Sequence, residues 1–311
     1  MKILLLGANG QLGRSFLEHG GLAARGHLIV TTRNGNRLEG HPTEIADLSK
    51  PDTLSVLLDQ LQPQLIVNAA AYTAVDRAEQ EEALATRING EAVGMLGDWA
   101  AAHGALVVHY STDYVFDGQA LQPYAVDAPT DPLGAYGRSK LAGEQALLAS
   151  GAAHLILRTA WVYAPHSNNF LRTMLRLGAE RDELRVVADQ YGAPTSTGLI
   201  VRATLAALDA WQQASLTLRQ QLQGTHHLVA SGHTSWHGFA TAIFDAAKAH
   251  DLIAHKPRLV PIGTAEFPTL AKRPAWSVLD NNGFEQHFGY SLPKWQDGLH
   301  DVIQTLSTQV R

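Results

Sequence analysis

An apolar run followed at once by a glycine-rich turn opens the chain, and this feature restricts the possible fold most strongly. Residues 2–6 read KILLL, which is typical of a strand buried on both faces of a parallel sheet. Gly7, Gly10 and Gly13 follow with the spacing GxxGxxG, which differs from the GxGxxG of many dehydrogenases. The first glycine permits a tight turn, the second lets a pyrophosphate approach a helix N-terminus, and the third lets that helix pack closely. The sequence therefore predicts nucleotide binding.

The periodicity of the remaining chain extends this unit into a doubly wound parallel sheet (Rossmann-type) with a second, smaller α/β domain. Further strands of the main sheet are expected at residues 27–32, 44–46, 63–68, 105–110, 154–159 and 226–230, with one long helix over about 75–103. A strand outside the main sheet is expected at 184–190, another strand at 258–262, and helices at about 170–179, 195–213, 235–249 and 293–308. We expect a nucleotide-binding domain of residues 1–160 plus about 195–232, and a substrate domain of about 161–194 plus 233–311.

The end of the second expected strand indicates which dinucleotide the chain prefers. About 20 residues after the glycines, NAD-binding chains carry a carboxylate for the ribose 2′-hydroxyl, but here Arg33 follows two threonines, with Arg37 close behind. Because Arg33 can pair with a 2′-phosphate, the sequence favours NADPH and leaves NADH use open. The alternative is that Arg33 is only a solvated loop residue. Asp47 and Leu48 are placed to bracket the adenine, although Asp47 could equally cap the next helix.

Two other strand ends carry residues suited to the same crevice. A run of small residues follows the strand at 63–68 and leaves room for the ribose and phosphate of the cofactor, and it contains Ala70, Ala71, Tyr72 and Thr73. Ser111 and Thr112 follow the strand at 105–110, where a hydroxyl can donate to a substrate carbonyl. Either hydroxyl alone could be a turn cap, but both together at this position favour a functional site.

Tyr136 and Lys140 lie four residues apart and therefore share one face of a helix. The unperturbed pKa of tyrosine, near ~10, is too high for chemistry at neutral pH, and a neighbouring ammonium can lower it by roughly 1–3 units. Because one lysine does not easily supply the whole shift, the pair makes most sense beside the positive nicotinamide ring of a dinucleotide. By itself, Tyr-x-x-x-Lys is common, and its ordinary explanation is an exposed helix pair.

Composition excludes several classes of function. The net charge of −5 without a basic run argues against nucleic-acid binding, and no apolar stretch reaches membrane-spanning length. The absence of cysteine excludes disulfides, thiolate nucleophiles and cysteine-based zinc sites. Since Met1 leads directly into a strand, no signal peptide is expected, and the expected compartment is the cytoplasm. The histidines at 226, 227, 233 and 237 lack carboxylate support, so no metal site is expected among them.

Together these elements resemble the extended short-chain dehydrogenases/reductases, and longer blocks are similar to the dTDP-4-dehydrorhamnose reductase family. The matching blocks are residues 68–76 (NAAAYTAVD), 110–118 (YSTDYVFDG), 136–144 (YGRSKLAGE), 158–163 (RTAWVY), 168–170 (NNF) and 189–195 (DQYGAPT). With the glycine turn included, the match runs from the first strand to the C-terminal region, where Arg273-Pro274 is a further anchor. So many blocks in the same order are far more specific than any one of them.

The resemblance implies NADPH-dependent reduction of the C4 ketone of dTDP-4-dehydro-L-rhamnose to dTDP-L-rhamnose. It implies Tyr136 as proton donor, Lys140 on the nicotinamide ribose and Thr112 on the sugar ketone. The expected cofactor-binding residues are Gly7, Asn9, Gly10, Gln11, Leu12, Gly13, Arg33, Asp47, Leu48, Ala70, Ala71, Tyr72, Thr73, Ser111, Tyr136 and Lys140. The expected substrate-binding residues are Thr112, Asp113, Tyr136, Trp161, Asn169, Gln190 and Arg273.

Two alternatives stay open at this point. A sugar-nucleotide epimerase or dehydratase would retain NAD(P) instead of consuming it, and a non-catalytic NADP-binding regulatory subunit would act on a second polypeptide. Some relatives carry acidic residues that serve a metal-bridged dimer where this chain has Arg14-Ser15 and Thr197-Gly198. No metal is therefore predicted, and the chain is expected to be a monomer or a homodimer.

Overall fold

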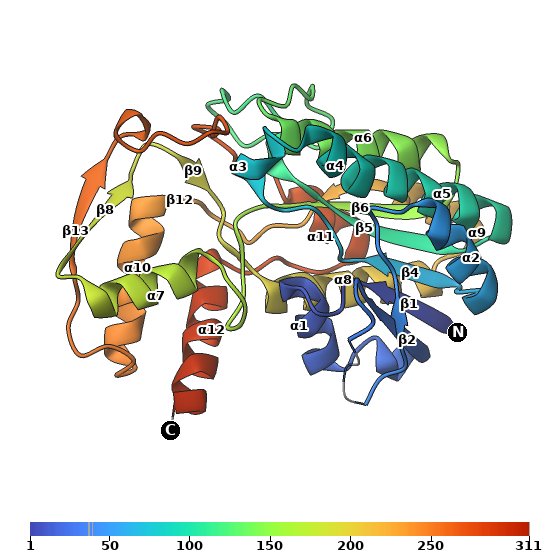
Figure 1. Ribbon diagram of the computed structural model, residues 1–311, viewed down its shortest axis with the longest axis horizontal. Helices are drawn as coiled ribbons and strands as arrows, with labels where there is room; N and C mark the ends of the chain where they lie inside the picture. The colour runs from blue at the N-terminus through green and yellow to red at the C-terminus, as the bar shows by residue number, and fades with distance from the viewer. Residues whose placement is uncertain (37, 39, 311) are drawn as a thin grey trace.

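Seven parallel strands form the central sheet, in the order β11-β6-β5-β4-β1-β2-β3 (Figure 1). The computed structural model describes residues 1–36, 38 and 40–310, so Arg37 lies outside the described residues. The strands are β1 (Lys2–Leu6), β2 (His27–Thr32), β3 (Thr43–Ile45), β4 (Leu65–Asn68), β5 (Leu106–Thr112), β6 (Ala153–Thr159) and β11 (Gly224–His227). The chain runs outward from β1 to β3 and then returns to β4, so the topological switch point lies between β1 and β4. The predicted fold class is confirmed.

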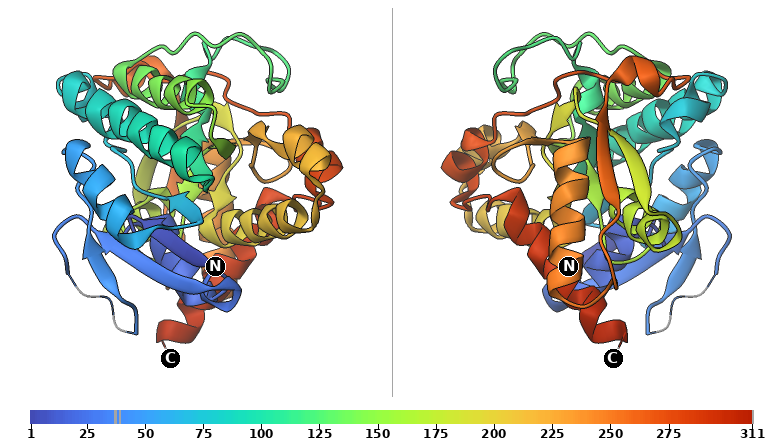
Figure 2. Two further views of the ribbon diagram at one scale, coloured as in Figure 1. Left: turned by 90° about the vertical axis from the view of Figure 1, so that its right-hand side faces the viewer. Right: turned by 90° about the vertical axis from the view of Figure 1, so that its left-hand side faces the viewer.

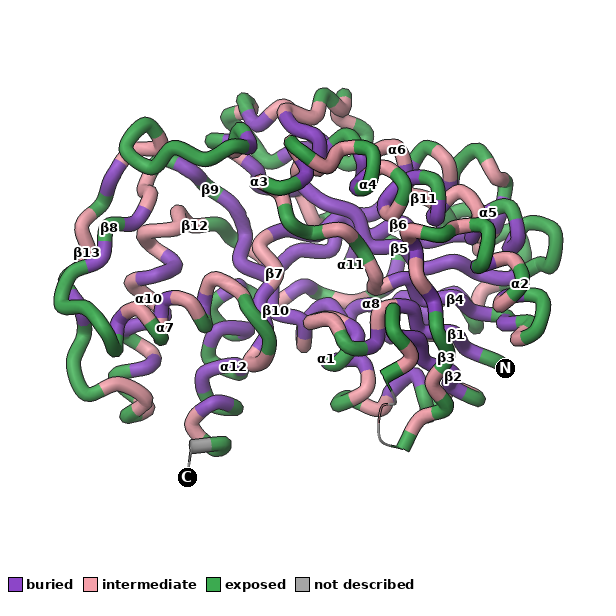
Figure 3. Tube along the Cα trace, viewed as in Figure 1, coloured by how far each residue is buried: buried purple, intermediate pink, exposed green. Residues whose placement is uncertain are grey.

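Side chains of β1 alternate between two hydrophobic cores. Ile3 and Leu5 belong to the core that contains helices α1 (Gln11–His19) and α8 (Thr197–Gln213), whereas Leu4 and Leu6 belong to the core on the other face. That second core receives α2 (Asp52–Leu61), α5 (Ala92–His103) and α6 (Ala135–Ala149). These four side chains of β1 are fully buried, whereas Lys2 at its start is exposed, and the tube in Figure 3 shows the burial of the central strands. Burial on both faces explains the unbroken apolar run.

The long helix expected over 75–103 is interrupted. The structure has α3 (Val75–Ala78), α4 (Glu82–Thr86) and a π-helical turn (Arg87–Glu91) before α5. Polar side chains of this segment bind groups outside it: Glu79 accepts from the backbone N–H of Ala135 at 2.9 Å, and Asn89 accepts from that of Tyr72 at 2.9 Å. The expectation of one helix was wrong, because the hydrophobic periodicity of a sequence contains no information about such long-range contacts.

The second part of the molecule lies beside the carboxyl ends of the strands (Figures 1 and 2). Its strand β8 (Glu183–Val187) lies outside the main sheet, as predicted, and pairs in parallel with β13 (Arg258–Ile262), a pairing that was not predicted. The helices of this part are α7 (Phe170–Glu180), α10 (Trp236–Ala249) and α12 (Trp295–Val310). Two further short strand pairs lie outside the main sheet. β7 (Val162–Tyr163) pairs with β10 (Thr195–Ser196), and β9 (Tyr191–Gly192) pairs with β12 (Thr234–Ser235).

Two short helices were not predicted, α9 (Leu216–Leu222) and α11 (Asn282–Phe288). Each spans only seven residues, so neither gives a strong periodic signal. In the part of the chain that the structure describes, none of the helices combines the length and the apolar character that crossing a membrane demands. The domain boundaries given above stay a prediction.

Candidate active site

A cleft of about 770 Å³ opens along the carboxyl ends of the central strands, between the two parts of the molecule. Most of the residues that the sequence singled out line it: Gly7, Asn9, Gly10, Gln11, Leu12, Arg33, Asp47, Leu48, Ala70, Ala71, Thr73, Ser111, Thr112, Asp113, Tyr136, Lys140 and Trp161. Five do not line it: Gly13, Tyr72, Asn169, Gln190 and Arg273. Segments far apart in the sequence thus converge where open α/β sheets bind ligands.

The glycine turn has the shape that a pyrophosphate requires. Gly7 has φ of +76°, and a Cβ on Gly7 would lie 2.8 Å from the Cα of Ala70. A Cβ on Gly13 would lie 2.2 Å from the carbonyl oxygen of Gly7, so Gly13 packs against the turn instead of lining the cleft. Helix α1 begins after Gly10 without a side-chain cap and without an acidic residue in its first turn. Its free N–H groups and helix dipole fit an anionic group.

The adenosine end of the cleft is polar and partly exposed. Arg33 is exposed and belongs to the lining, as do Asp47 and the buried Leu48. The carboxylate of Asp47 accepts from the backbone N–H of Ser49 at 3.0 Å and from its hydroxyl at 2.7 Å. Asp47 therefore stabilises its own turn and is not the N-cap of α2. The Tyr72 hydroxyl points away from the cleft and donates to Glu81 at 2.6 Å.

Tyr136 and Lys140 lie in the first half of α6, which begins directly after Gly134. The ring of Tyr136 meets the ring of Tyr114 edge-on, with centroids 5.6 Å apart. Burial raises the pKa of Tyr136, and the neighbouring Thr112 hydroxyl acts in the opposite direction. The lowering expected from Lys140 is therefore not found, because burial disfavours the phenolate.

The amine of Lys140 is buried behind Tyr136. Its Nζ donates to the carbonyl oxygen of Tyr110 at 2.6 Å and lies 3.4 Å from Nε2 of His109. Burial lowers the pKa of Lys140 to about 8, and the carboxylate of Glu144 acts in the opposite direction. A lysine that changes its charge near neutral pH is characteristic of functional sites.

The carboxyl end of β5 supplies further polar groups to the cleft. Burial raises the pKa of Asp113 to about 6, while the neighbouring hydroxyls of Ser277 and Thr112 act in the opposite direction. The Thr112 hydroxyl donates to Asp113 at 3.0 Å and accepts from a backbone N–H at 3.2 Å. The hydroxyls of Ser111 and Thr159 are buried without a hydrogen-bond partner in the described structure. Buried hydroxyls of this kind at a cleft fit a polar ligand.

Trp161 lines the cleft, but its ring is already stacked. Its indole lies parallel to that of Trp236 of α10, with ring centroids 3.4 Å apart and 2° between the planes. Trp161 adopts φ of +47°, and a Cβ on Gly192 would lie 2.4 Å from its ring. Because Trp236 covers one face of the Trp161 ring, that face is not free to stack on a bound ligand.

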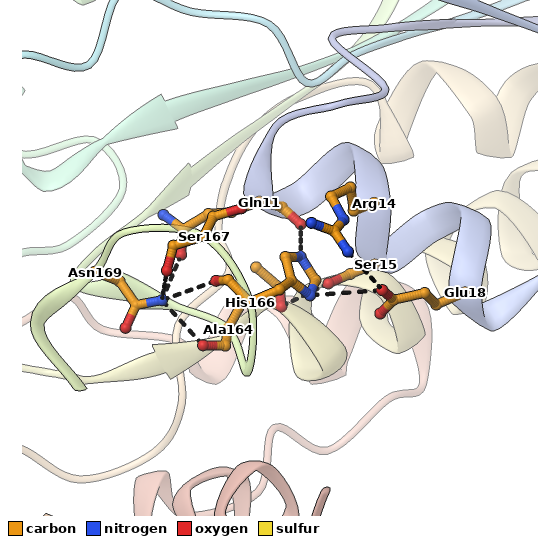
Figure 4. Close-up of polar contacts among 9 residues, drawn as sticks. Gln11, Arg14, Ser15, Glu18, Ala164, His166, Ser167 and Asn169 are labelled. Atoms are coloured by element: carbon orange, nitrogen blue, oxygen red, sulfur yellow. Dashed lines mark hydrogen bonds and ion pairs between the residues drawn. The ribbon is translucent and has the colours of Figure 1, made fainter. Parts of the chain in front are cut away.

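Asn169 and its neighbours connect the second part of the molecule with the glycine-turn helix (Figure 4). The side-chain oxygen of Asn169 accepts from the backbone N–H of Arg172 at 3.1 Å and caps α7. Its amide donates to the side chain of Gln11 at 3.0 Å and to the carbonyl of Ala164 at 2.9 Å. A ring nitrogen of His166 lies 3.0 Å from the carbonyl oxygen of Gln11. Asn169 therefore holds a loop against α1.

Gln190 and Arg273 do not line the cleft, and each donates hydrogen bonds to other side chains. Gln190 donates to the hydroxyl of Thr264 at 3.1 Å. Arg273 donates to the carboxylate of Asp76 at 2.7 Å and to the hydroxyl of Tyr114 at 3.0 Å. Arg273 thus positions the tyrosine that packs against Tyr136.

Sequence reasoning missed several residues of this site. Tyr114 and Thr159 line the cleft, and His109 lies directly behind it. Thr159 ends β6, so the strand-end rule that found Ser111 applied to it as well. His109 is a polar residue within an otherwise apolar strand, which is a signal that the sequence did contain. Among residues 1–36, 38 and 40–310, no group of three or more histidines and carboxylates is arranged to hold a metal ion.

Comparisons with known proteins agree with this geometry. Residues 1–308 match the profile of the family described as RmlD substrate binding domain. The dTDP-4-dehydrorhamnose reductase of Burkholderia thailandensis is 44% identical over 311 residues, covering 99% of this chain and 100% of that protein. That of Escherichia coli (strain K12) is 41% identical over 309 residues, covering 99% of each chain.

A solved structure is also similar over nearly the whole length. The dTDP-4-dehydrorhamnose reductase of Bacillus anthracis in complex with NADP is 31% identical with a TM-score of 0.83, covering 98% of this chain and 99% of that one. The resemblance inferred from the sequence blocks is confirmed by these matches. The chain belongs to the RmlD substrate binding domain family.

Proposed function

We propose that this chain reduces the C4 ketone of dTDP-4-dehydro-L-rhamnose to dTDP-L-rhamnose with NADPH. The observation that carries the proposal is that Tyr136, Lys140 and Thr112 share one cleft with the uncapped glycine turn. Relatives named for this reductase activity cover the whole chain, and one of them was solved with NADP. In this proposal, residues 1–160 plus about 195–232 bind the cofactor and the remaining residues bind the sugar nucleotide.

The chain's own residues fit an NADP(H) molecule along the cleft. The turn from Gly7 to Gly13 and the first N–H groups of α1 would hold the pyrophosphate, because no side chain fills this space. Arg33 would pair with the 2′-phosphate at the exposed end. Ala70 and Ala71 would leave room for the ribose beside the nicotinamide. The bound cofactor supplies a hydride to the ketone carbon.

In the proposed mechanism, Tyr136 gives its phenolic proton to the C4 oxygen as negative charge develops there. The hydroxyl of Thr112 donates a hydrogen bond to the same oxygen and stabilises that charge. To do so, Thr112 exchanges its present bond to Asp113 for one to the substrate. A charged Lys140 opposes the effect of burial on Tyr136 and favours the phenolate that remains after proton transfer.

The proposed substrate contacts divide into two groups. Thr112, Asp113 and Trp161 line the cleft, and of these Thr112 has to give up its hydrogen bond to Asp113 to reach a ligand. Asn169, Gln190 and Arg273 stay in the proposal, but each would have to exchange a hydrogen bond that it makes now.

The proposal is tested by following NADPH absorbance after adding dTDP-4-dehydro-L-rhamnose to the purified protein. Stoichiometric loss of NADPH is expected, whereas an epimerase or dehydratase would retain the cofactor. Tyr136→Phe removes only the phenolic hydroxyl group, which carries the transferred proton, so kcat/KM should fall roughly 10²–10⁴-fold.

Tyr163→Phe is the matched control, because it removes a buried hydroxyl of a tyrosine that does not line the cleft. This variant should keep the activity of the wild type. An undiminished rate in Tyr136→Phe would exclude the proposed proton donor.

A further inference from the structure

A row of buried polar groups crosses from β4 through β5 to Lys140. The backbone N–H of Ala70 donates to Oδ1 of Asn68 at 3.2 Å, and Nδ2 of Asn68 lies 3.1 Å from Nδ1 of His109. Nε2 of His109 lies 3.4 Å from Nζ of Lys140. Asn68, His109 and Lys140 are 1%, 0% and 2% exposed, so they depend on one another for hydrogen bonds. Neither Asn68 nor His109 lines the cleft.

The direction of every hydrogen bond in this row is set at its first member. A backbone N–H can only donate, so Oδ1 of Asn68 is the acceptor and its amide group faces His109. The amide donates to Nδ1 of His109, and a neutral imidazole that accepts at Nδ1 carries its proton on Nε2. Burial lowers the pKa of His109 well below its ordinary value, which disfavours the doubly protonated ring. The Nε2–H group therefore points toward Lys140.

This arrangement suits an uncharged amine at Lys140 and not an ammonium. An ammonium has three donors and no lone pair, so it would face the N–H of His109 donor against donor. An uncharged amine accepts from His109 with its lone pair and still donates to the carbonyl oxygen of Tyr110 at 2.6 Å. The row thus favours the neutral form of Lys140.

The other ionisable groups around Lys140 are few. His109 and Tyr110 come from β5, Tyr136 and Glu144 come from α6 itself, and Arg158 of β6 binds Glu144 through both carboxylate oxygens. The carboxylate of Glu144 favours the charged lysine, but Arg158 already neutralises it. Burial lowers the pKa of Lys140, in the same direction as the row of hydrogen bonds.

We propose that Asn68 and His109 are positioning residues that hold the amine of Lys140 as a hydrogen-bond acceptor and so favour its uncharged form. This inference rests on the role given to Lys140 in the proposed function. The proposed reduction uses the charged form of Lys140. As the pH rises, kcat/KM should therefore begin to fall at a lower pH than it would with a lysine of ordinary pKa.

The first test is the tautomer of His109, which is measured without any substrate. In protein carrying ¹⁵N-labelled histidine, two-bond ¹H–¹⁵N spectra distinguish Nε2–H from Nδ1–H, and His109→Gln identifies the signal by its loss. The Nε2–H form is expected throughout about pH 6–9. A Nδ1–H tautomer or an imidazolium in this range would overturn the proposal.

The second test uses Asn68→Asp to reverse the donor and acceptor roles along the row of hydrogen bonds. A carboxylate only accepts, so His109 must place its proton on Nδ1 and offer the lone pair of Nε2 to a charged Lys140. The tautomer should switch, and the alkaline limb of kcat/KM should move up by about one pH unit or more. A shifted limb with an unchanged tautomer would show that the added charge alone acts, which contradicts the proposal.

The two readouts separate the inference from the proposed function. If the protein has no reductase activity, the tautomer of His109 still decides whether the row has the proposed direction. If Asn68→Asp does not fold, the spectrum of the wild type is sufficient to reject or retain the proposal.

Discussion

Lys140 and Glu144 lie one turn apart on α6 and are both buried, but their charges are compensated very differently. Arg158 donates to both carboxylate oxygens of Glu144, at 2.9 and 2.7 Å. The guanidinium also donates to the carbonyl oxygen of Val126 at 3.0 Å and lies 5.1 Å from the centre of the Phe116 ring. Among the residues that the structure describes, no carboxylate forms an ion pair with Lys140, and its hydrogen-bonding neighbours are a carbonyl oxygen and an imidazole.

The difference shows what each charge is suited to do. A buried charge with a complete set of partners stays charged over a wide pH range and serves the structure. A buried charge with an incomplete set changes its protonation near neutral pH, which is useful beside a reacting group. Helix α6 therefore carries one charge that stabilises the fold, Glu144, and one that is suited to catalysis, Lys140. Substitutions at each position can test the two roles separately.

The largest effect is expected from breaking the structural pair. Arg158→Met leaves the carboxylate of Glu144 buried without a partner, so the free energy of unfolding should fall by about 3–5 kcal/mol. Urea denaturation of the variant and the wild type measures this difference. The double variant Arg158→Met, Glu144→Leu is the control and should recover most of the loss, because it removes both charges. A single variant as stable as the wild type would contradict the assignment.

Lys140→Met removes a buried charge that has no carboxylate partner among the described residues, so its effect on the free energy of unfolding should depend on pH. The pKa of Lys140 is lowered from 10.5 to about 8, so the unfolded chain binds more protons between these values. The wild type should therefore gain stability relative to the variant as the pH rises from 8 to 10.5, by about 3 kcal/mol at 1.36 kcal/mol per unit. Parallel denaturation curves at both pH values measure it. Equal pH dependence of the two proteins would show that Lys140 is not strained by burial.

Sequence alone gave most of the sheet and of the cleft, for reasons that are local. Gly7 and Gly13 stand where added side chains would collide with backbone, and such requirements appear directly in a sequence. Contacts across the fold are not visible in this way. The bond of Arg273 to Asp76 joins residues 197 positions apart, and no local pattern in the sequence indicates that these two side chains meet.

The same limit applies to the electrostatics of the site. The spacing of Tyr136 and Lys140 predicted their shared helix face, but not the burial that raises the pKa of the tyrosine. Nor could it show that Lys140 meets His109, because that contact depends on the packing of α6 against β5. Sequence reasoning thus located the groups, and the three-dimensional packing determines their protonation.

Asp113→Asn tests a second incompletely compensated charge, this one acidic. The pKa of Asp113 is raised from 3.8 to about 6, so the native state binds more protons than the unfolded chain between these values. The wild type should lose stability relative to the variant as the pH rises from 3.8 to 6, by about 3 kcal/mol, with the full loss present above pH 6. Thermal or urea unfolding at both ends of this range measures it. A wild type that gained stability over the range would place Asp113 among the well-paired carboxylates.

The smallest effects are expected from two buried tyrosine hydroxyls, which compare a paired with an unpaired polar group when neither is charged. Tyr163 is 1% exposed and its hydroxyl has no hydrogen-bond partner in the described structure, whereas the buried hydroxyl of Tyr110 lies 2.9 Å from that of Thr204. Tyr163→Phe should raise the free energy of unfolding by roughly 1 kcal/mol, because it removes a buried polar group that makes no bond. Tyr110→Phe, the same substitution, should lower it by about the same amount, because it leaves Thr204 unpaired. Opposite signs in one urea series would show that pairing, and not burial alone, decides whether a polar group stabilises this fold. If both substitutions changed the free energy of unfolding in the same direction, hydrogen-bond pairing would not explain the contrast between Glu144 and Lys140.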